Sequence, residues 1–241
     1  MFQQTIARIH LDHIQANIES VRKLIGRDKK ILIPVKANAY GHGAIPVSKL
    51  AEKIGVEWLG VASVPEGAQI RNANINLPIL KFSPAFPEEM EDAVKYNLTI
   101  TVCDIENISI LEKTCAKMDK MVDVHLKVDT GMGRIGVTPD DAVTYADYIE
   151  NKCPHLILDG IYSHLPVSDE ADLEYTQKQI QRFNAIVEDV NKTIGRKINL
   201  AHCSNSGGVL AHSSSWMDLI RPGIMIYGYY PSSETPRAIP L

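Results

Sequence analysis

Short apolar runs alternate along the whole chain with longer segments whose apolar residues recur at helical spacing. Eight such runs occur. Several are continuously apolar, which is typical of strands buried on both faces of a parallel sheet. The predicted strands are Ile31–Val35, Trp58–Ala62, Leu77–Leu80, Thr99–Cys103, Val122–Val128, Leu156–Tyr162, Ile198–Ala201 and Leu219–Tyr227.

The segments around these runs predict amphipathic helices. In the longest of them, Ile180, Phe183 and Val187 lie on one stripe at spacings of three and four residues. Thr138 followed by Pro139 is typical of a helix start, because threonine is a favoured N-cap and proline suits the first helical position. The predicted helices are His13–Ile25, Ala44–Ile54, Pro65–Asn72, Pro87–Lys95, Ile105–Lys117, Pro139–Glu150 and Ala171–Thr193.

Eight strand-then-helix units in 241 residues predict an α/β fold, a (β/α)8 TIM-type barrel, since such barrels typically take about 250 residues. An open doubly wound sheet is the alternative. We expect residues 1–230 to form the barrel. Residues 231–241 contain proline and serine at turn-like spacing, and we expect them to be a linker toward a C-terminal domain that the chain lacks.

The charge balance excludes some classes of partner. The chain has 25 basic and 29 acidic residues, a net charge of −4, so it lacks the basic field that nucleic-acid binding requires. No apolar run approaches the roughly 20 residues of a membrane span, and residues 1–8 lack the pattern of a secretory signal. The cysteine spacings fit neither metal nor disulfides, so we expect reduced thiols in a cytoplasmic protein. The cysteines are Cys103, Cys115, Cys153 and Cys203.

Polar residues follow several predicted strands, at the end of a barrel where catalytic residues lie. Lys36 comes directly after the first strand, where desolvation lowers the pKa of an amine and allows it to form a Schiff base. A lysine that reaches solvent at the barrel rim is the alternative. The other candidates from these positions are Asn38, Tyr40, His42, Lys127, Asp129, Arg134, His164, Asn205, Ser206 and Arg221.

Two loops suggest a phosphate site. Asn205–Gly208 follows the seventh strand and Arg221–Gly223 lies at the eighth, and barrels frequently bind phosphate with these two loops. Ordinary turns are the alternative.

A third glycine-containing segment, Gly131–Gly136, matches G-x-G-x-x-G. The predicted helix starts beyond it, so the segment favours a loop that brings Arg134 to an anion over a dinucleotide site. A solvated arginine is the alternative for Arg134, and a structural histidine for His164. Cys203 is set aside as a nucleophile, because the side chains of adjacent strand residues such as His202 and Cys203 point to opposite faces.

Several segments resemble the signatures of one known family. Val35–Gly43, with the sequence V-K-A-N-A-Y-G-H-G, resembles the pyridoxal-phosphate (PLP) lysine motif of alanine racemases, and His125–Gly136 resembles their second signature. Tyr162–His164, His202–Ser206 and Arg221–Gly228 match the later blocks in the same order. The resemblance covers residues 7–231 and implies a PLP-binding barrel.

The resemblance also implies roles for individual residues. Lys36 would bind PLP covalently and serve as the base for the D-enantiomer. Arg221 would face the pyridine nitrogen of the cofactor, with His164 hydrogen-bonded to it. Arg134 would lie close to the substrate carboxylate, and Lys127 matches a position that is carbamylated in many members. The residues that would hold the cofactor phosphate are Tyr40, Asn205, Ser206, Gly223 and Ile224.

The implied activity is that of an isomerase, a PLP-dependent alanine racemase that interconverts L- and D-alanine for peptidoglycan precursors. The full-length protein would be a homodimer, and its second base a tyrosine from the partner's C-terminal domain. Because that position lies beyond Leu241, we expect this chain to be incomplete for two-base catalysis. The alternatives are a stand-alone PLP-homeostasis barrel, a racemase for serine or another small amino acid, a class I aldolase using Lys36 or Lys127, and an inert binding barrel.

Overall fold

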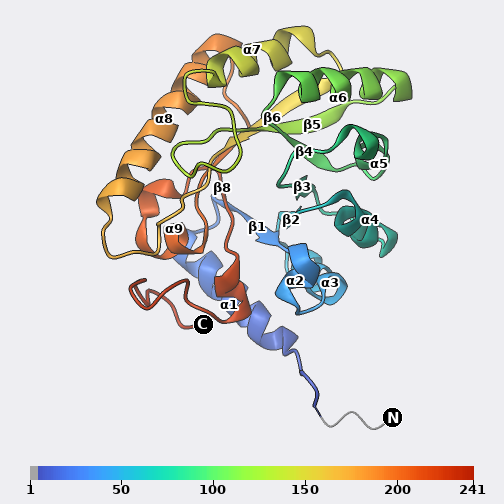
Figure 1. The fold of residues 1–241 in the computed structure, drawn as a ribbon. Coiled ribbons are helices and arrows are strands. Elements are labelled where there is room, and N and C mark those ends of the chain that lie inside the picture. The colour runs from blue at the N-terminus through green and yellow to red at the C-terminus, as the bar shows by residue number, and fades with distance from the viewer. Residues whose placement is uncertain (1–4) are drawn as a thin grey trace.

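The computed structural model describes residues 5–241. The predicted absence of a secretory signal concerns residues 1–8, of which 1–4 lie outside the described residues. Eight parallel strands form one sheet in the order β7-β6-β5-β4-β3-β2-β1-β8, and helices surround it (Figure 1). The strands are β1 (Lys30–Pro34), β2 (Trp58–Val61), β3 (Ile79–Lys81), β4 (Thr99–Val102), β5 (Val122–Lys127), β6 (Leu156–Tyr162), β7 (Leu200–His202) and β8 (Leu219–Ile220).

The first and last strands of this order, β7 and β8, meet through backbone hydrogen bonds donated by the residues that flank β8. The N–H of Asp218 donates to the carbonyl of Ala201 at 3.1 Å, and that of Arg221 donates to the carbonyl of Ser204 at 2.9 Å. The sheet therefore closes into the predicted (β/α)8 barrel, and that prediction is confirmed.

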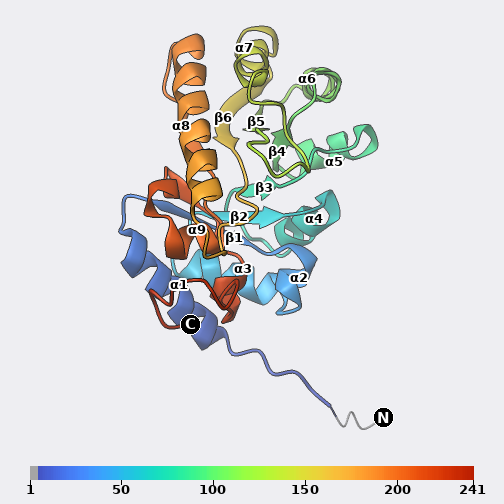
Figure 2. The same cartoon turned by 60° about the vertical axis from the view of Figure 1, so that its left-hand side comes forward.

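The helices follow one another around the sheet in chain order, which the turned view shows for α4 to α8 (Figure 2). They bury the larger apolar core against the outer face of the strands, where Phe183 is completely buried. The helices are α1 (Leu11–Ile25), α2 (Lys36–Tyr40), α3 (Ala44–Lys53), α4 (Val64–Asn72), α5 (Met90–Lys95), α6 (Ile105–Met118), α7 (Ala142–Lys152), α8 (Glu174–Ile194) and α9 (Ser206–Ala211), with 3-10 turns η1 (Pro87–Glu89), η2 (Ser213–Ser215) and η3 (Ile224–Tyr227).

The eighth strand is much shorter than predicted. We expected Leu219–Tyr227, but β8 ends at Ile220 and the residues after Gly223 form η3. Pro222 has no N–H to donate to a strand ladder, so the sheet stops before it. As a consequence Arg221 lies directly beyond the strand, at the end of the barrel where catalytic residues are found.

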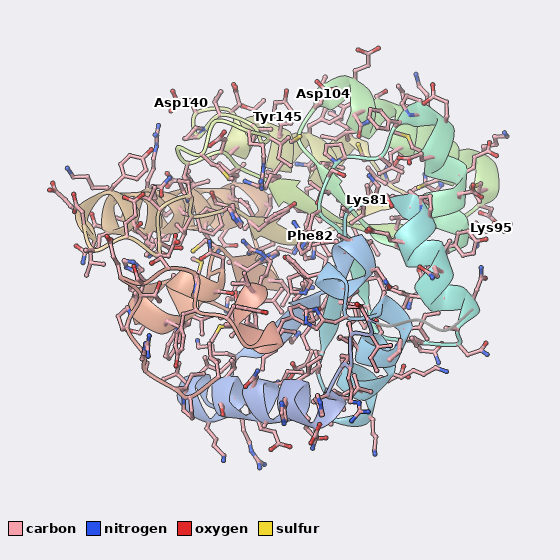
Figure 3. All side chains as sticks on the ribbon, turned by 60° about the horizontal axis from the view of Figure 1, so that its bottom comes forward. Lys81, Phe82, Lys95, Asp104, Asp140 and Tyr145 are labelled. Atoms are coloured by element: carbon pink, nitrogen blue, oxygen red, sulfur yellow. The ribbon has the colours of Figure 1, made fainter. Side chains whose placement is uncertain are left out.

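The start of α7 also differs from the prediction. The helix begins at Ala142 rather than at Pro139, and the exposed Asp140 belongs to the turn before it (Figure 3). The hydroxyl of Thr138 donates to the carboxylate of Asp141 at 2.7 Å and accepts the N–H of the same residue at 3.3 Å, so it closes the turn before α7, whose N-cap is Asp141. Val137 bonds Lys127 and Asp129 through its N–H and carbonyl, so the chain must turn before a helix can begin.

A second, smaller apolar cluster lies inside the barrel. The ring centroids of Trp58 on β2 and His125 on β5 are 5.4 Å apart. Since β2 and β5 are not neighbours in the sheet, this contact crosses the barrel interior. Nearer the carboxyl ends of the strands the interior is polar, with Thr101 and Tyr162 sharing a hydrogen bond of 2.7 Å. The apolar members are Leu32, Trp58, Leu80, Leu200 and Leu219, with Phe82 against them.

Residues 231–241 contain no helix or strand and contact the loop before α8. The carboxylate of Glu234 accepts the N–H of Ala171 at 2.6 Å, the hydroxyl of Ser232 donates to the carbonyl of Asp169, and Thr235 is buried. The domain boundary at residue 230 stays a prediction.

Two expectations from composition concern the described residues as a whole. No helix in residues 5–241 combines the length and apolar character needed to cross a membrane. All four cysteines are free thiols, as the cysteine spacing predicted.

Candidate active site

A cavity of about 230 Å³ opens at the carboxyl ends of the strands. All ten residues that the sequence singled out for a cofactor and substrate lie in its wall, although they come from both halves of the chain. They are Lys36, Tyr40, Lys127, Arg134, His164, Asn205, Ser206, Arg221, Gly223 and Ile224.

The cavity wall is strongly basic. Among the described residues that line it, four are lysine or arginine, and the one carboxylate is that of Asp169. A cavity with this charge favours an anionic ligand. The four cations are Lys36, Lys127, Arg134 and Arg221.

Lys36 is presented by an unusual turn. The four residues from Ala37 to Tyr40 all have φ between 51° and 54°, and the N–H of Ala37 donates to the carboxylate of Glu66 at 2.8 Å. Residues other than glycine rarely adopt this left-handed conformation, which costs roughly 1–2 kcal/mol per residue. Strain of this kind persists where the surroundings enforce it and is concentrated at functional sites.

Two lysines of the site have weakened basicity. Burial lowers the pKa of the Lys36 amine, Arg134 and Arg221 lower it further, and Glu66 acts in the opposite sense. Burial lowers the pKa of Lys127 to about 7, with Arg221 and Arg134 contributing and Asp129 opposing. Both amines therefore lose a proton more readily than an ordinary lysine, and the neutral amine is the nucleophilic form.

The carboxylate of Asp129 organises the loop that carries Arg134. It accepts the N–H groups of four consecutive residues, Gly131 to Arg134, at 2.8–3.2 Å. Burial works to raise the pKa of Asp129, but the N–H donors of Gly131, Met132 and Gly133 outweigh it and hold the pKa below its ordinary value. The loop is thus fixed by one anion. The helix starts at Ala142, so the segment does not meet the requirement of a dinucleotide fingerprint.

We expect Asp129→Asn to destabilise the protein at neutral pH by about 1–2 kcal/mol, the range for hydrogen bonds to a charged group after screening. Because the folded pKa is depressed, the stabilisation is present above the unfolded pKa and is lost as the pH falls through the folded pKa. Urea unfolding of both proteins at several pH values measures this. A difference that stays constant from neutral pH to acid would contradict the ionic role.

Arg221 is buried, with 4% of its surface exposed, and donates to three acceptors. These are Nδ1 of His202 at 2.6 Å, the carbonyl of Ser163 at 2.8 Å and that of Cys203 at 3.2 Å. Burial lowers the pKa of Arg221 to about 10, so the guanidinium remains charged at neutral pH.

The histidine that contacts Arg221 is a correction to the prediction. We expected His164, but among the described residues it is His202 that shares a hydrogen bond with the guanidinium. His164 lines the cavity instead, and burial together with Arg221 and Arg134 lowers its pKa to about 3. The sequence feature that could have identified His202 is the alternation of side chains between the two faces of β7. It directs His202 into the barrel and Cys203 outward, where its thiol contacts the carbonyl of Ser215 at 3.7 Å.

The loops after β7 and β8 meet, as predicted for a phosphate site. The hydroxyl of Ser206 accepts the N–H of Gly223 at 2.9 Å, and Asn205 caps α9 by accepting the N–H of Gly208 at 3.0 Å. A Cβ atom added to Gly223 would lie 3.3 Å from the hydroxyl of Tyr40. The hydroxyl of Ser206 lies 3.8 Å from the same point, so two hydroxyls converge on the space that this glycine leaves open.

Two other candidates have structural roles. The side-chain oxygen of Asn38 accepts the N–H of Ala44 at the start of α3, at 2.8 Å. The ring of His42 stacks on Tyr227 at 4.7 Å. Both support the turn around Lys36 from outside the cavity wall.

Residues 9–231 match the family described as "Alanine racemase, N-terminal domain". The alanine racemase of Treponema denticola is 41% identical over 240 residues, which cover 98% of this chain and 63% of that protein. The alanine racemase of Desulforamulus reducens is 38% identical over 231 residues, which cover 96% of this chain and 62% of that protein.

Solved structures agree with these matches. An alanine racemase from Clostridium difficile 630 superposes with a TM-score of 0.93 at 33% identity, covering 98% of this chain and 62% of that one. The alanine racemase from Bacillus anthracis with bound L-Ala-P has a TM-score of 0.89 at 31% identity, covering 97% of this chain and 60% of that one. The chain spans about three fifths of the length of these relatives.

Proposed function

The chain belongs to the family of alanine racemase N-terminal domains, and from this premise we propose that it is the cofactor-binding part of a PLP-dependent alanine racemase, an isomerase. The observation that carries the proposal is one basic cavity that combines a strand-end amine with a space beside Gly223 onto which the hydroxyls of Tyr40 and Ser206 converge. A small amino acid is the substrate that such a cavity suits.

The residues of the cavity fit PLP. Its dianionic phosphate matches the space beside Gly223, where Ser206 and Tyr40 bring their hydroxyls. Its aldehyde matches the amine of Lys36, and its ring nitrogen matches the guanidinium of Arg221. When bound, PLP supplies a conjugated system that delocalises the electron pair left at Cα of the substrate.

The residues of this chain would then have separate roles in the reaction. Lys36 Nζ, with its lowered pKa, would take the Cα proton on its face and return it there. Arg221 can only donate a hydrogen bond, so it would leave the ring nitrogen unprotonated and favour simple return of the proton. Arg134, fixed by the Asp129 loop, would hold the substrate carboxylate. For the opposite face we propose the tyrosine of a partner subunit that the family resemblance implies, in a full-length homodimer.

The test is an assay of the protein with added PLP. We expect a visible absorption band, and hydrogen exchange at Cα of D-alanine followed by NMR in heavy water, with serine as a parallel substrate. PLP binding without exchange would favour the homeostasis barrel. A borohydride-trapped sugar phosphate, with no affinity for PLP, would favour the aldolase.

Lys127 is the second group with a proposed chemistry. The residue is 2% exposed, and its amine donates to the carbonyl of Val128 at 2.8 Å and lies near Arg221 and Arg134. A neutral amine adds to carbon dioxide, forming an N–C bond and releasing one proton to solvent, and the two guanidiniums would stabilise the carbamate anion that results. We therefore propose that Lys127 is carbamylated, with the carbamate beside Arg134.

We expect one protein-bound carbamate signal in NMR spectra of the protein in isotope-labelled bicarbonate. The signal should be absent from Lys127→Met, in which the side chain is similar in length but has no amine. A signal that persists in Lys127→Met, or none in the unaltered protein, would contradict the assignment.

The supply of D-alanine for peptidoglycan and the cytoplasmic location stay predictions. They rest on the family resemblance and on the free thiols.

A further inference from the structure

A chain of hydrogen bonds runs through the barrel interior from Arg221 to Asp159, near the middle of β6. Arg221 Nη1 lies 2.6 Å from His202 Nδ1. His202 Nε2 lies 3.0 Å from His125 Nδ1, and His125 Nε2 lies 3.3 Å from Asp159 Oδ2. Both histidines have no exposed surface, so water does not replace these contacts.

The donors and acceptors allow one direction along the chain. A guanidinium only donates, so Nδ1 of His202 must accept and its proton must lie on Nε2. That proton is donated to Nδ1 of His125, whose own proton on Nε2 is donated to Asp159. Burial lowers the pKa of His202 well below its ordinary value, which agrees with a neutral ring.

Asp159 is suited to be the anionic end. Burial works to raise its pKa, but hydrogen bonds from His125 and Asn199 outweigh this and keep the pKa below its ordinary value. Asn199 donates to Oδ1 at 2.8 Å, which leaves Oδ2 for His125. The ionised carboxylate can only accept, so it fixes which nitrogen of His125 carries the proton.

An irregularity of β6 brings Asp159 to this position. Val124 pairs with Leu158 and His125 pairs with Gly160, so Asp159 is an extra residue in a β-bulge. Bulges next to functional sites re-aim a side chain in this way. A Cβ atom on Gly160 would lie 2.7 Å from the ring of His125, so only glycine leaves room for that ring. The bulge at Asp159 and the glycine at position 160 thus both allow the contact between Asp159 and His125.

We propose that Asp159 and His125 are positioning residues that hold Arg221 at the cofactor ring nitrogen, an inference that rests on the proposed function. Asp159 fixes the tautomer of His125, whose free Nδ1 then accepts the Nε2–H of His202 and holds that ring in place as the acceptor for the guanidinium. Arg221 has no ion pair with a carboxylate within residues 5–241. The two histidines therefore connect this buried cation to its anion.

The first test is nitrogen NMR of the histidine rings in the protein without cofactor. We expect both His125 and His202 as neutral rings protonated at Nε2. In His125→Phe the Nε2–H of His202 loses its acceptor, whereas Arg221 still donates to Nδ1. The His202 ring should therefore stay protonated at Nε2, but its Nε2–H signal should shift upfield and exchange faster with solvent. In His125→Gln the side-chain amide can accept and donate, so the Nε2–H signal of His202 should stay close to that of the unaltered protein. Protonation at Nδ1 of either ring, or an unchanged Nε2–H signal of His202 in His125→Phe, would overturn the inference.

The second test is the affinity for PLP, measured by absorbance titration. His125→Phe should bind PLP about tenfold more weakly, the effect of losing one hydrogen bond that acts on a charged group, and His125→Gln should stay close to the unaltered protein. Trp58→Phe is the packing control, because Trp58 contacts the ring of His125 without joining the chain of hydrogen bonds. Equal losses in Trp58→Phe and His125→Phe would overturn the positioning role.

The two tests separate the inference from the proposed function. If the unaltered protein shows the expected tautomers but binds no PLP, the proposed function fails and takes the cofactor role of Arg221 with it. If PLP binds but the tautomers differ, the inference alone is overturned.

Discussion

Replacing Lys36 by alanine should abolish the covalent attachment of PLP and lower Cα hydrogen exchange of D-alanine by at least about 10²–10⁴-fold, the contribution of one positioned acid–base group. The amine lies in the cavity wall, and its pKa is lowered by burial and by Arg134 and Arg221. Borohydride reduction measures the attachment, and NMR in heavy water measures the exchange.

Lys81 provides the matched control for Lys36. It is also a lysine at the end of a strand and is 2% exposed, but its amine donates to the carbonyls of Ser83 and Pro84 at 3.1 and 2.8 Å. It is the last residue of β3 and is labelled in Figure 3. Lys81→Met should lower stability and leave the attachment intact. Attachment lost in Lys81→Met, or kept in Lys36→Ala, would contradict the assignment of Lys36.

Gly136→Ala should destabilise the protein by about 3 kcal/mol or more, because backbone strain and overpacking each cost about 1–3 kcal/mol. Gly136 has φ of +134°, and an added Cβ would lie 2.5 Å from the backbone nitrogen of Asp129 and 2.8 Å from the carbonyl carbon of Val128. Backbone atoms cannot move aside as a flexible side chain can. The loop that carries Arg134 should therefore shift, and urea unfolding and PLP titration would both record this.

Gly133 lies in the same loop and separates strain from overlap. It also has a positive φ, +71°, but an added Cβ would meet nothing within 4 Å. Gly133→Ala should therefore cost only about 1 kcal/mol. Equal losses in the two variants would show that the close approach at Gly136 contributes nothing.

Most strands of the barrel were predictable because a strand that is buried on both faces has a continuous apolar sequence. The predictions for β2, β4, β5 and β6 agree with the structure to within one residue at each end. The eighth strand was overestimated because Ile224–Tyr227 is as apolar as a strand. The strand is shorter because Pro222 lacks the N–H that would continue the ladder, and a prediction based on hydrophobic pattern does not detect the effect of one proline.

The site residues were predictable in part. All ten lie in one cavity, because residues that follow parallel strands meet at one end of a barrel. The left-handed turn from Ala37 to Tyr40 was not foreseen, since alanine has no preference for that conformation and the surrounding contacts impose it. The same holds for the bulge at Asp159, which depends on the pairing of β5 with β6.

The measurement that tests the central claim most directly is the position of the borohydride-fixed cofactor. The protein is loaded with PLP, reduced, digested and examined by peptide mass spectrometry. The account predicts one pyridoxyl group, on the peptide that contains Lys36, and no modification of Lys81 or Lys127. A pyridoxyl group on another lysine, or no adduct at all, would contradict it.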